Sequence, residues 1–122
     1  MRKIKFRGRT VNGEWLYGTL QVPAVNSVPY YMWNKDKFQC AVDENTIGQY
    51  TGLKDKNGQE IYEGDIIKSE GLNRLGRVIF SQGAYRVDFG PCSYLLNILI
   101  DEFDTLVIGN IYDNPELTES IE

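Results

Sequence analysis

Histidine is absent from the 122-residue sequence, so no site in this chain can use an imidazole. That absence excludes Ser-His and Cys-His dyads and every zinc site with histidine ligands. Cysteine is nearly as scarce, because Cys40 and Cys92 are the only two and stand 52 positions apart. We expect both to be reduced thiols packed in the core rather than a disulfide or a reactive thiolate.

Long apolar runs are also missing, so no segment reaches the roughly 20 residues that a membrane-spanning helix needs. The N-terminal residues MRKIKFRGRT are basic but lack the apolar stretch of a secretory signal. The apolar fraction of 42% and the charged fraction of 25% are those of soluble globular proteins. We therefore expect residues 1–122 to form a single cytoplasmic domain that makes no membrane contact.

The two ends of the chain carry charges of opposite sign, although the net charge is only −4. The first nine residues hold five basic residues and no acidic one, whereas no basic residue follows Arg86. The acidic residues after Arg86 are Asp88, Asp101, Glu102, Asp104, Asp113, Glu116, Glu119 and Glu122. This asymmetry indicates either a polyanion-binding end or two ends that neutralise each other within the fold or between subunits. The second interpretation is favoured, because most surface charges serve no binding function.

Short alternating segments separated by turn residues are abundant in the first third of the chain. Residues 4–11 alternate between apolar and basic or polar side chains, which predicts a strand with one buried face. Asn12-Gly13 then predicts the type I′ turn of a hairpin. Further strands are expected at Glu14–Tyr17, Tyr30–Trp33 and Phe38–Val42, the last two around a turn at Asn34–Lys37. Residues 1–45 are thus expected to form β hairpins.

Glycine and charge are concentrated in residues 47–67, IGQYTGLKDKNGQEIYEGDII. We expect strands at Gln49–Leu53 and Gln59–Tyr62 around a turn at Lys54–Gly58, in which Gly58 supplies the positive φ angle. Glu63-Gly64-Asp65 predicts a second turn before a strand that begins at Ile66. Turn chemistry therefore accounts for most of the glycines in this stretch.

The last third of the chain predicts a further hairpin, one short helix and a final strand. Arg77–Phe80 and Ala84–Phe89 alternate around a turn at 81–83. Apolar residues recur at three and four spacing between 92 and 103, which favours a helix over about Ser93–Glu102. Expected after it are a strand at Thr105–Tyr112, interrupted by Gly109 as a bulge or a close contact, and a terminal turn with Pro115 at its first helical position. The fold class expected is mainly β, a barrel or sandwich with one short helix.

Four motifs in this order resemble the YopX-like proteins, a family found mostly in phages and prophages of bacteria. The matching stretches are IKFRG at 4–8, GEWLYG at 13–18, VDENTIGQYTGLKDKNGQEIYEGDII at 42–67 and VIGNIYDNPEL at 107–117. The resemblance implies a mostly β protein with an SH3-like barrel in residues 46–122, acting in the cytoplasm of a bacterial host. It supplies no activity, cofactor or catalytic residue.

The acidic residues do not form a recognisable catalytic pattern. Glu63, Asp65 and Lys68 come nearest to a metal-dependent nuclease, but their spacing is wrong and Glu-Gly-Asp before a strand is an ordinary turn. The glycines at 52, 58 and 64 are followed by no Gly-Lys-Ser phosphate loop. We expect no catalytic residue, no metal site and no cofactor.

Binding residues are easier to nominate. The candidate partner-binding residues are Lys3, Lys5, Arg7, Tyr50, Lys54 and Lys56, of which the first three would form a basic stripe on one strand face together with Arg9. The stripe would suit a phosphate backbone, but the net charge of −4 disfavours nucleic acid. Trp15, Tyr17 and Trp33 fit either a core or a protein interface.

These patterns favour a non-enzymatic interaction module that acts through contacts with a phage or host protein, through self-association as a homo-oligomer, or both. A nucleic-acid-binding barrel that uses the basic N-terminal strand is the first alternative. A carboxylate-dependent hydrolase is the second.

Overall fold

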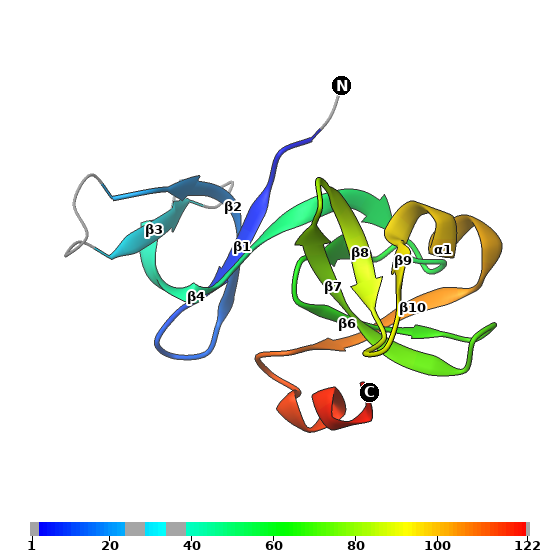
Figure 1. Ribbon diagram of the computed structural model, residues 1–122. Helices are drawn as coiled ribbons and strands as arrows, with labels where there is room; N and C mark the ends of the chain where they lie inside the picture. Colours follow the sequence, from blue (N-terminus) through cyan, green and yellow to red (C-terminus); the bar gives the residue numbers. More distant parts are fainter. Residues whose placement is uncertain (1–2, 24–28, 34–38, 122) are drawn as a thin grey trace. The chain divides into compact units, whose positions relative to one another are not determined.

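A computed structural model describes residues 3–23, 29–33 and 39–121 of the chain (Figure 1). The turn expected at Asn34–Lys37 and residue Phe38 lie outside these ranges. The chain separates into two compact units, residues 1–50 and 51–122, and each is described by itself. The expectation of a mainly β protein with one short helix is confirmed.

The first unit is built from four antiparallel strands, of which the first also pairs with the fourth. They are β1 (Phe6–Arg9), β2 (Trp15–Gln21), β3 (Tyr30–Trp33) and β4 (Gln39–Lys54). Each consecutive pair is hydrogen-bonded, and β1 also pairs with β4, with a register shift between Arg7 and Arg9. Every one of these four strands therefore has a hydrogen-bonded neighbour on both sides.

The first hairpin is confirmed, but its predicted type I′ turn is wrong. The strands end at Arg9 and resume at Trp15, so the connection is longer than the two residues of that turn. The Thr10 N–H donates to the Glu14 carbonyl (2.9 Å), and the Gly13 N–H donates to the Thr10 carbonyl (3.0 Å). Within this loop Gly13 has φ +85°, so only one of the two predicted positions takes the left-handed conformation.

One face of these four strands is the interior of the first unit. Register places Phe6, Leu16, Leu20, Met32 and Val42 on this face, and Met32 and Val42 are the most deeply buried of them. Gly8 lies among them, and a Cβ there would come within 3.0 Å of Met32 Sδ and of Val42 Cγ2. The strands can therefore approach this closely only because residue 8 has no side chain.

The strand β4 continues for 16 residues, from Gln39 to Lys54, whereas the sequence predicted two separate strands in this region. Asp43-Glu44-Asn45 forms an exposed polar run in its middle, which hides the alternation on which the prediction depended. Gly52, near its end, has φ +86°. The last residues of β4 belong to the second unit, where β5 (Glu60–Tyr62) is its neighbour in the sheet.

The second unit contains a five-stranded antiparallel sheet in the order β10-β6-β7-β8-β9. Its strands are β6 (Asp65–Ser69), β7 (Arg74–Ser81), β8 (Ala84–Asp88), β9 (Ser93–Leu95) and β10 (Thr105–Asn110). Helix α1 (Leu96–Glu102) connects β9 to β10, and a 3₁₀ helix (Pro115–Ser120) follows. The last strand thus pairs with the first of the meander, and the SH3-like barrel expected here stays a prediction.

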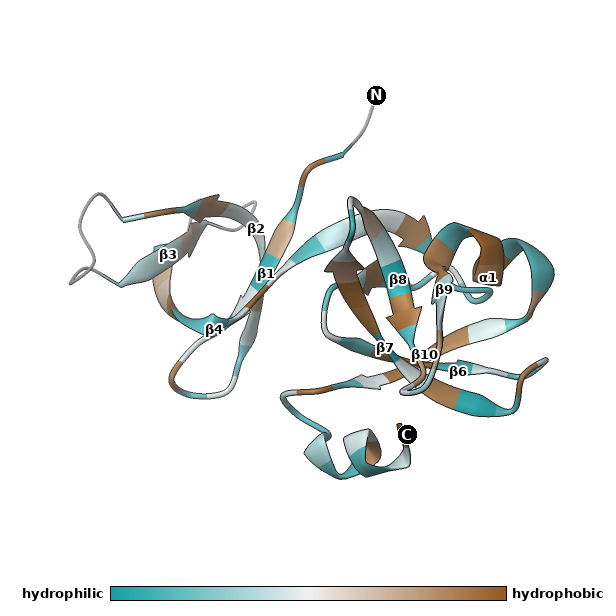
Figure 2. Ribbon diagram, viewed as in Figure 1, coloured by the Kyte–Doolittle hydropathy of each residue, from teal (hydrophilic) through white to brown (hydrophobic). Residues whose placement is uncertain are grey.

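An apolar cluster fills the second unit. Its buried members are Ile61, Ile67, Val78, Val87, Phe89, Leu96 and Leu99. In Figure 2 apolar bands recur along β7, β8 and α1, the elements that supply most of this cluster. Gly76 on β7 is closely packed, because a Cβ there would clash with Val87 and approach the Asp88 carbonyl at 3.0 Å.

Three predictions near the C-terminus have different outcomes. The predicted helix began at Ser93, but Ser93–Leu95 instead pair with Arg86–Asp88 of β8, so the helix begins at Leu96. The bulge expected at Gly109 is confirmed by a register shift between Val107 and Gly109. Pro115 does occupy the start of the terminal 3₁₀ helix. Within the described ranges, no helix is long and apolar enough to cross a membrane.

Candidate functional site

The predicted basic stripe is not a continuous surface. Lys3 is exposed, but Arg7 is only 5% exposed and its Cζ lies 4.8 Å from the centre of the Trp15 ring. Lys5 Nζ lies 5.5 Å from the Tyr50 ring, and Tyr50 is likewise 5% exposed. Both geometries are those of cation–π contacts. Arg7 and Tyr50 are therefore covered by neighbouring side chains, and neither offers a surface to a phosphate or a base.

Trp15 is the centre of this cationic arrangement. Arg9, two residues beyond Arg7, also approaches the Trp15 ring, with Cζ 5.9 Å from its centre. A cation over an indole face is worth about 0.5–1 kcal/mol when exposed and about 2 kcal/mol when desolvated. The alternation of basic residues that suggested a binding stripe thus places two guanidinium groups on one half-buried tryptophan.

The other two candidate residues, Lys54 and Lys56, belong to the second unit and are exposed. Lys56 Nζ lies 3.8 Å from Asp104 Oδ2 and 4.0 Å from Glu70 Oε2, and its side chain is 42% exposed. Exposed pairs of this kind contribute about 0–1 kcal/mol to stability. Asp104, one of the acids expected to neutralise the N-terminal stripe, therefore has Lys56 of its own unit as a partner.

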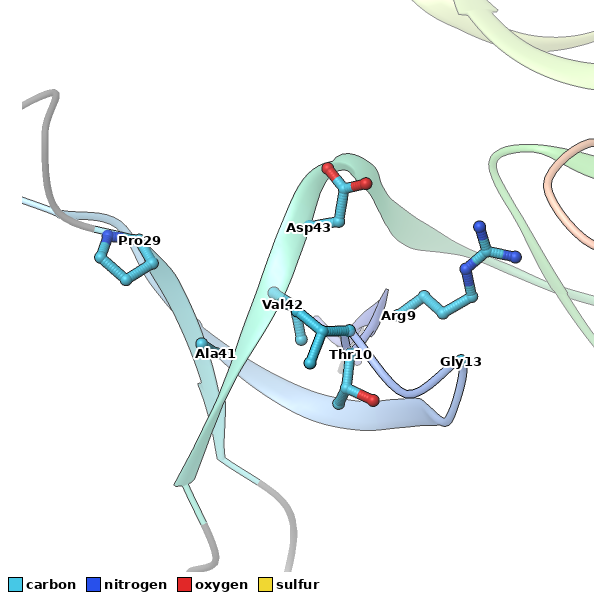
Figure 3. A pocket seen from close by; sticks show the side chains of 8 residues that line it. Arg9, Thr10, Gly13, Pro29, Ala41, Val42 and Asp43 are labelled. Carbon is cyan, nitrogen blue, oxygen red and sulfur yellow. The ribbon is translucent and has the colours of Figure 1, made fainter.

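A hollow of about 450 Å³ opens on the first unit (Figure 3). Its lining is Arg9, Thr10, Val11, Gly13, Pro29, Ala41, Val42 and Asp43. Its volume falls within the range of small-molecule sites, roughly 300–1,000 Å³. Arg9 and Asp43 are partners in the β1–β4 register, yet the Arg9 side chain extends away from Asp43 in Figure 3.

The polar groups of this hollow are used to shape the turns around it. Thr10 Oγ1 accepts the Glu14 N–H at 3.3 Å, and Asp43 Oδ1 accepts the Asn45 N–H at 3.0 Å. Thr46 Oγ1 donates to the Asp43 carbonyl (2.7 Å) and accepts the Arg9 N–H (2.8 Å). The one hydroxyl and the one carboxylate in the lining of the hollow, Thr10 and Asp43, thus accept backbone N–H groups. Among the described residues, neither is paired with a side chain that would activate it as a nucleophile or a base.

Asp65 of the second unit also serves the backbone. Asp65 is 2% exposed, and its Oδ2 accepts the Tyr62 N–H at 2.8 Å, so the Glu63–Asp65 pair does not converge on an open site. Among the residues that the structure describes, no group of three His, Cys, Asp or Glu side chains could hold a metal ion. Cys92 is exposed and Cys40 half-buried, so the expectation of two core thiols is wrong for Cys92.

Asp55 is a structural residue of the Gly-rich stretch that sequence reasoning missed. It is 7% exposed, and its Oδ1 accepts the backbone N–H groups of Asn57 (2.9 Å) and Gln59 (3.0 Å). Its Oδ2 accepts the Val107 N–H at 3.0 Å, 52 positions away. An aspartate at the start of a turn that ends in Asn-Gly signals the local bonds. The bond to Val107 has no local signal.

An aromatic surface lies on the outer side of the first unit, opposite its interior. Cross-strand register pairs Thr19 with Trp33, Trp33 with Gln39, and Gln21 with Tyr31, so these side chains share one face with Tyr17. We call Tyr17, Thr19, Gln21, Tyr31, Trp33 and Gln39 the aromatic–amide face. Tyr17 is 46% exposed and Trp33 37% exposed. Trp15 is half-buried, whereas Tyr17 and Trp33 are exposed, so the last two do not belong to a core.

Side-chain hydrogen bonds order this face. Gln21 Oε1 accepts from Trp33 Nε1 at 3.2 Å and from Gln39 Nε2 at 3.1 Å. One amide oxygen therefore joins β2, β3 and β4 through their side chains. The indole ring is held in one orientation although it stays accessible to solvent.

Comparisons with known proteins agree with this architecture. The model of the family described as YopX protein matches residues 5–119. The crystal structure of protein EF1440 from Enterococcus faecalis has a TM-score of 0.65 at 28% identity, covering 96% of this chain and 99% of its own. The crystal structure of YopX from Bacillus subtilis has a TM-score of 0.60 at 18% identity, covers 100% of both chains, and supports the fold alone. No curated protein matches the chain. Because the family model spans nearly its whole length, the chain belongs to the YopX family.

Proposed function

We propose that this protein is a non-enzymatic interaction module that acts through protein contacts, in the cytoplasm of a bacterial host. The observation that carries the proposal is the aromatic–amide face, which exposes Tyr17 and Trp33.

The composition of this face matches that of protein interfaces. Such interfaces are enriched in Tyr and Trp and depleted in Lys, Glu and Asp at their centres. Tryptophan and tyrosine are also the commonest anchors of binding energy. The hydrogen bond from Trp33 to Gln21 fixes the indole before a partner arrives, which lowers the ordering cost of about 0.5–1.5 kcal/mol per immobilised side chain.

Nucleic acid remains the disfavoured alternative partner. Lys3, Lys54 and Lys56 are exposed, but the burial of Arg7 and Tyr50 removes one cation and one stacking ring from the proposed surface. The hydrolase alternative is weaker still, because buried Asp65 is occupied by the Tyr62 N–H.

Affinity capture from a bacterial host extract tests the protein-contact proposal. The bait would be the full chain, compared with a Tyr17→Ala/Trp33→Ala double variant and with Val11→Ala as the matched control. Val11 is the control because it is 93% exposed in the β1–β2 loop and lies off the face. We expect proteins retained by the wild type and by Val11→Ala to be lost from the double variant. Equal retention by all three would overturn the assignment of this face.

A further inference from the structure

We infer that the aromatic–amide face binds a proline-rich segment of a partner protein in the polyproline II conformation. This inference rests on the proposed function and adds the chemistry of the partner. It is carried by the spacing of the two exposed rings, by the donors beside them, by the pairing of the strands beneath them and by the size of the face.

The two exposed rings are spaced to take a third ring between them. Trp33 is opposite Thr19 in the β2–β3 register, and Tyr17 is two positions before Thr19, so the two rings are diagonal neighbours on one face. Diagonal positions lie about 7–8 Å apart. A ring packed between two others needs a contact distance of about 3.5–4.0 Å on each side, which adds up to the same spacing. Thr19, the residue between them, has a short side chain.

The hydrogen bond of the indole keeps the two rings apart. Trp33 Nε1 donates to Gln21 Oε1 at 3.2 Å, and Gln21 lies on the opposite side of Thr19 from Tyr17. The indole is thus held away from the tyrosine, and within the described ranges the Trp33 ring makes no ring contact with Tyr17. Each of these two rings therefore offers its own surface to a ligand.

The donors of the face match a backbone that has carbonyl groups and no N–H groups. Proline carries only the carbonyl, and polyproline II forms no internal hydrogen bonds, so its carbonyls need donors from outside the segment. Gln21 Oε1 accepts from both Trp33 and Gln39, so the Nε2 hydrogens of Gln21 are its contribution to a ligand. The Thr19 hydroxyl is a further donor between the two rings.

The strands beneath the face disfavour the other common way of binding an extended peptide. A peptide that adds to a sheet needs an open strand edge, but each of β1 to β4 has a hydrogen-bonded neighbour on both sides. A peptide on this face therefore contacts side chains rather than a strand edge. Proline-rich segments bind aromatic surfaces in this way.

The size of the face fits a short and ordered segment. Three strands about 4.8 Å apart and three outward positions of β2 at about 3.3 Å per residue give a patch of roughly 10 Å by 13 Å before side-chain reach. Polyproline II rises about 3.1 Å per residue, so about four residues span the patch. Stable interfaces between folded proteins bury about 800 Å² per partner, which is several times more. So small a contact favours an occupant whose conformation is already fixed.

Single-stranded nucleic acid also stacks on aromatic side chains, but it needs cations beside them. Arg7 and Arg9 of β1 lie on the same sheet face as Tyr17. Both guanidinium groups lie over the Trp15 ring, and Arg7 is only 5% exposed. These cations are thus engaged within the protein, and a neutral proline segment does not require them.

Titration of the full chain with acetylated and amidated decaproline, followed by ¹⁵N–¹H NMR, tests the inference. The chain has two tryptophans, so the indole N–H of half-buried Trp15 is an internal reference for that of Trp33. We expect the Trp33 indole resonance to shift with a dissociation constant of about 10 µM to 1 mM, because the contact is small. The Trp15 resonance should stay in place. A glycine–serine peptide of the same length should shift neither resonance.

Variants of the two rings and of the residue between them locate the binding, measured by fluorescence anisotropy of labelled decaproline. Trp33→Ala and Tyr17→Ala should each weaken binding by about tenfold or more, whereas Tyr17→Phe keeps the ring and should stay within about threefold. Thr19→Phe retains both rings but fills the space between them, so it should also weaken binding by about tenfold or more. Phe80→Ala is the matched control, because it removes an exposed ring from the second unit and should stay within about twofold. An unchanged melting temperature shows that a variant is folded.

Three results would overturn the inference. They are a Trp33 resonance that does not move up to about 10 mM decaproline, an equal shift with the glycine–serine peptide, and undiminished binding by Thr19→Phe. A shift with oligothymidylate but not with decaproline would assign the face to nucleic acid instead. Host proteins retained through Tyr17 and Trp33 by a chain that does not bind decaproline would leave the proposed function standing and refute the proline-rich partner alone.

Discussion

The two units of this chain are stabilised in different ways. Of the thirteen apolar side chains that are buried among the described residues, Met32, Val42 and Tyr50 belong to the first unit and the other ten to the second. The second unit has a continuous apolar cluster, whereas the first relies on strand pairings that return on themselves and on Arg7 packed against Trp15. Similar β structure is thus supported by a dense core in one unit and by closure and cation–π contacts in the other.

Truncation in each core should give the largest difference between the units. Leu99→Ala removes a fully buried side chain from the cluster of the second unit and should cost about 2–5 kcal/mol. Met32→Ala, equally buried in the smaller interior of the first unit, should lie at the low end of that range, because methionine is flexible and has fewer buried neighbours. Urea denaturation of both variants gives the two values. Equal losses would show that the interior of the first unit is as well packed as the cluster.

Loss of Asp55 should destabilise the second unit nearly as much. Asp55→Ala leaves three backbone N–H groups without their acceptor and should cost about 2–4 kcal/mol. Asp55→Asn keeps one acceptor oxygen and should cost less. Asn57→Ala, an exposed neighbour in the same turn, serves as the control and should change stability by less than about 0.5 kcal/mol. Hydrogen exchange should show the Val107 amide losing protection only in the Asp55 variants.

A β-branched residue at Gly58 tests backbone strain without a steric clash. Gly58 has φ +83°, and no atom lies within 4 Å of the position that its Cβ would take. Gly58→Val should therefore cost about 1 kcal/mol or more through the left-handed backbone alone. Gly58→Asn should recover most of that loss, since asparagine tolerates this conformation. Thermal unfolding that is unchanged in Gly58→Val would contradict the assigned turn.

Removal of the surface ion pairs should have the smallest effect. Lys56→Ala breaks contacts of 3.8 Å and 4.0 Å to exposed carboxylates and should change stability by less than about 1 kcal/mol, less at high salt. Arg7→Gln is the contrasting change in the first unit, because the Arg7 side chain is buried against Trp15. It should cost more than Lys56→Ala and be less sensitive to salt. A larger effect at Lys56 would mean that exposed pairs matter more here than buried cation–π contacts.

Local sequence signals predicted the parts of the fold that depend on few residues. Gly58 and Gly64 take the positive φ angles that the turns require, and the β7–β8 hairpin follows its alternation. Long-range features had no such signal. The continuity of β4 is hidden by its exposed polar centre, and Ser93–Leu95 are drawn into a strand by β8 rather than by their own helical spacing.

The candidate site was predicted only in part for the same reason. Alternation placed Lys5 and Arg7 on one strand face, but whether that face meets water or another side chain depends on Tyr50 and Trp15, far away in the sequence. Tyr17 and Trp33 were nominated from residue type alone. Their shared face with Gln21 became visible only with the register of β2 and β3.

The hydrogen bonds of the Asp55–Lys56 turn also cover part of an open sheet edge. Strand β10 is at the end of its sheet, and an open sheet edge is a template on which another chain can add a strand. The Val107 N–H donates to Asp55 Oδ2, and the Thr105 carbonyl accepts the Lys56 N–H at 3.2 Å, so both groups are already occupied. A turn from elsewhere in the chain thus covers this part of the edge, and a strand that added here would first have to displace it.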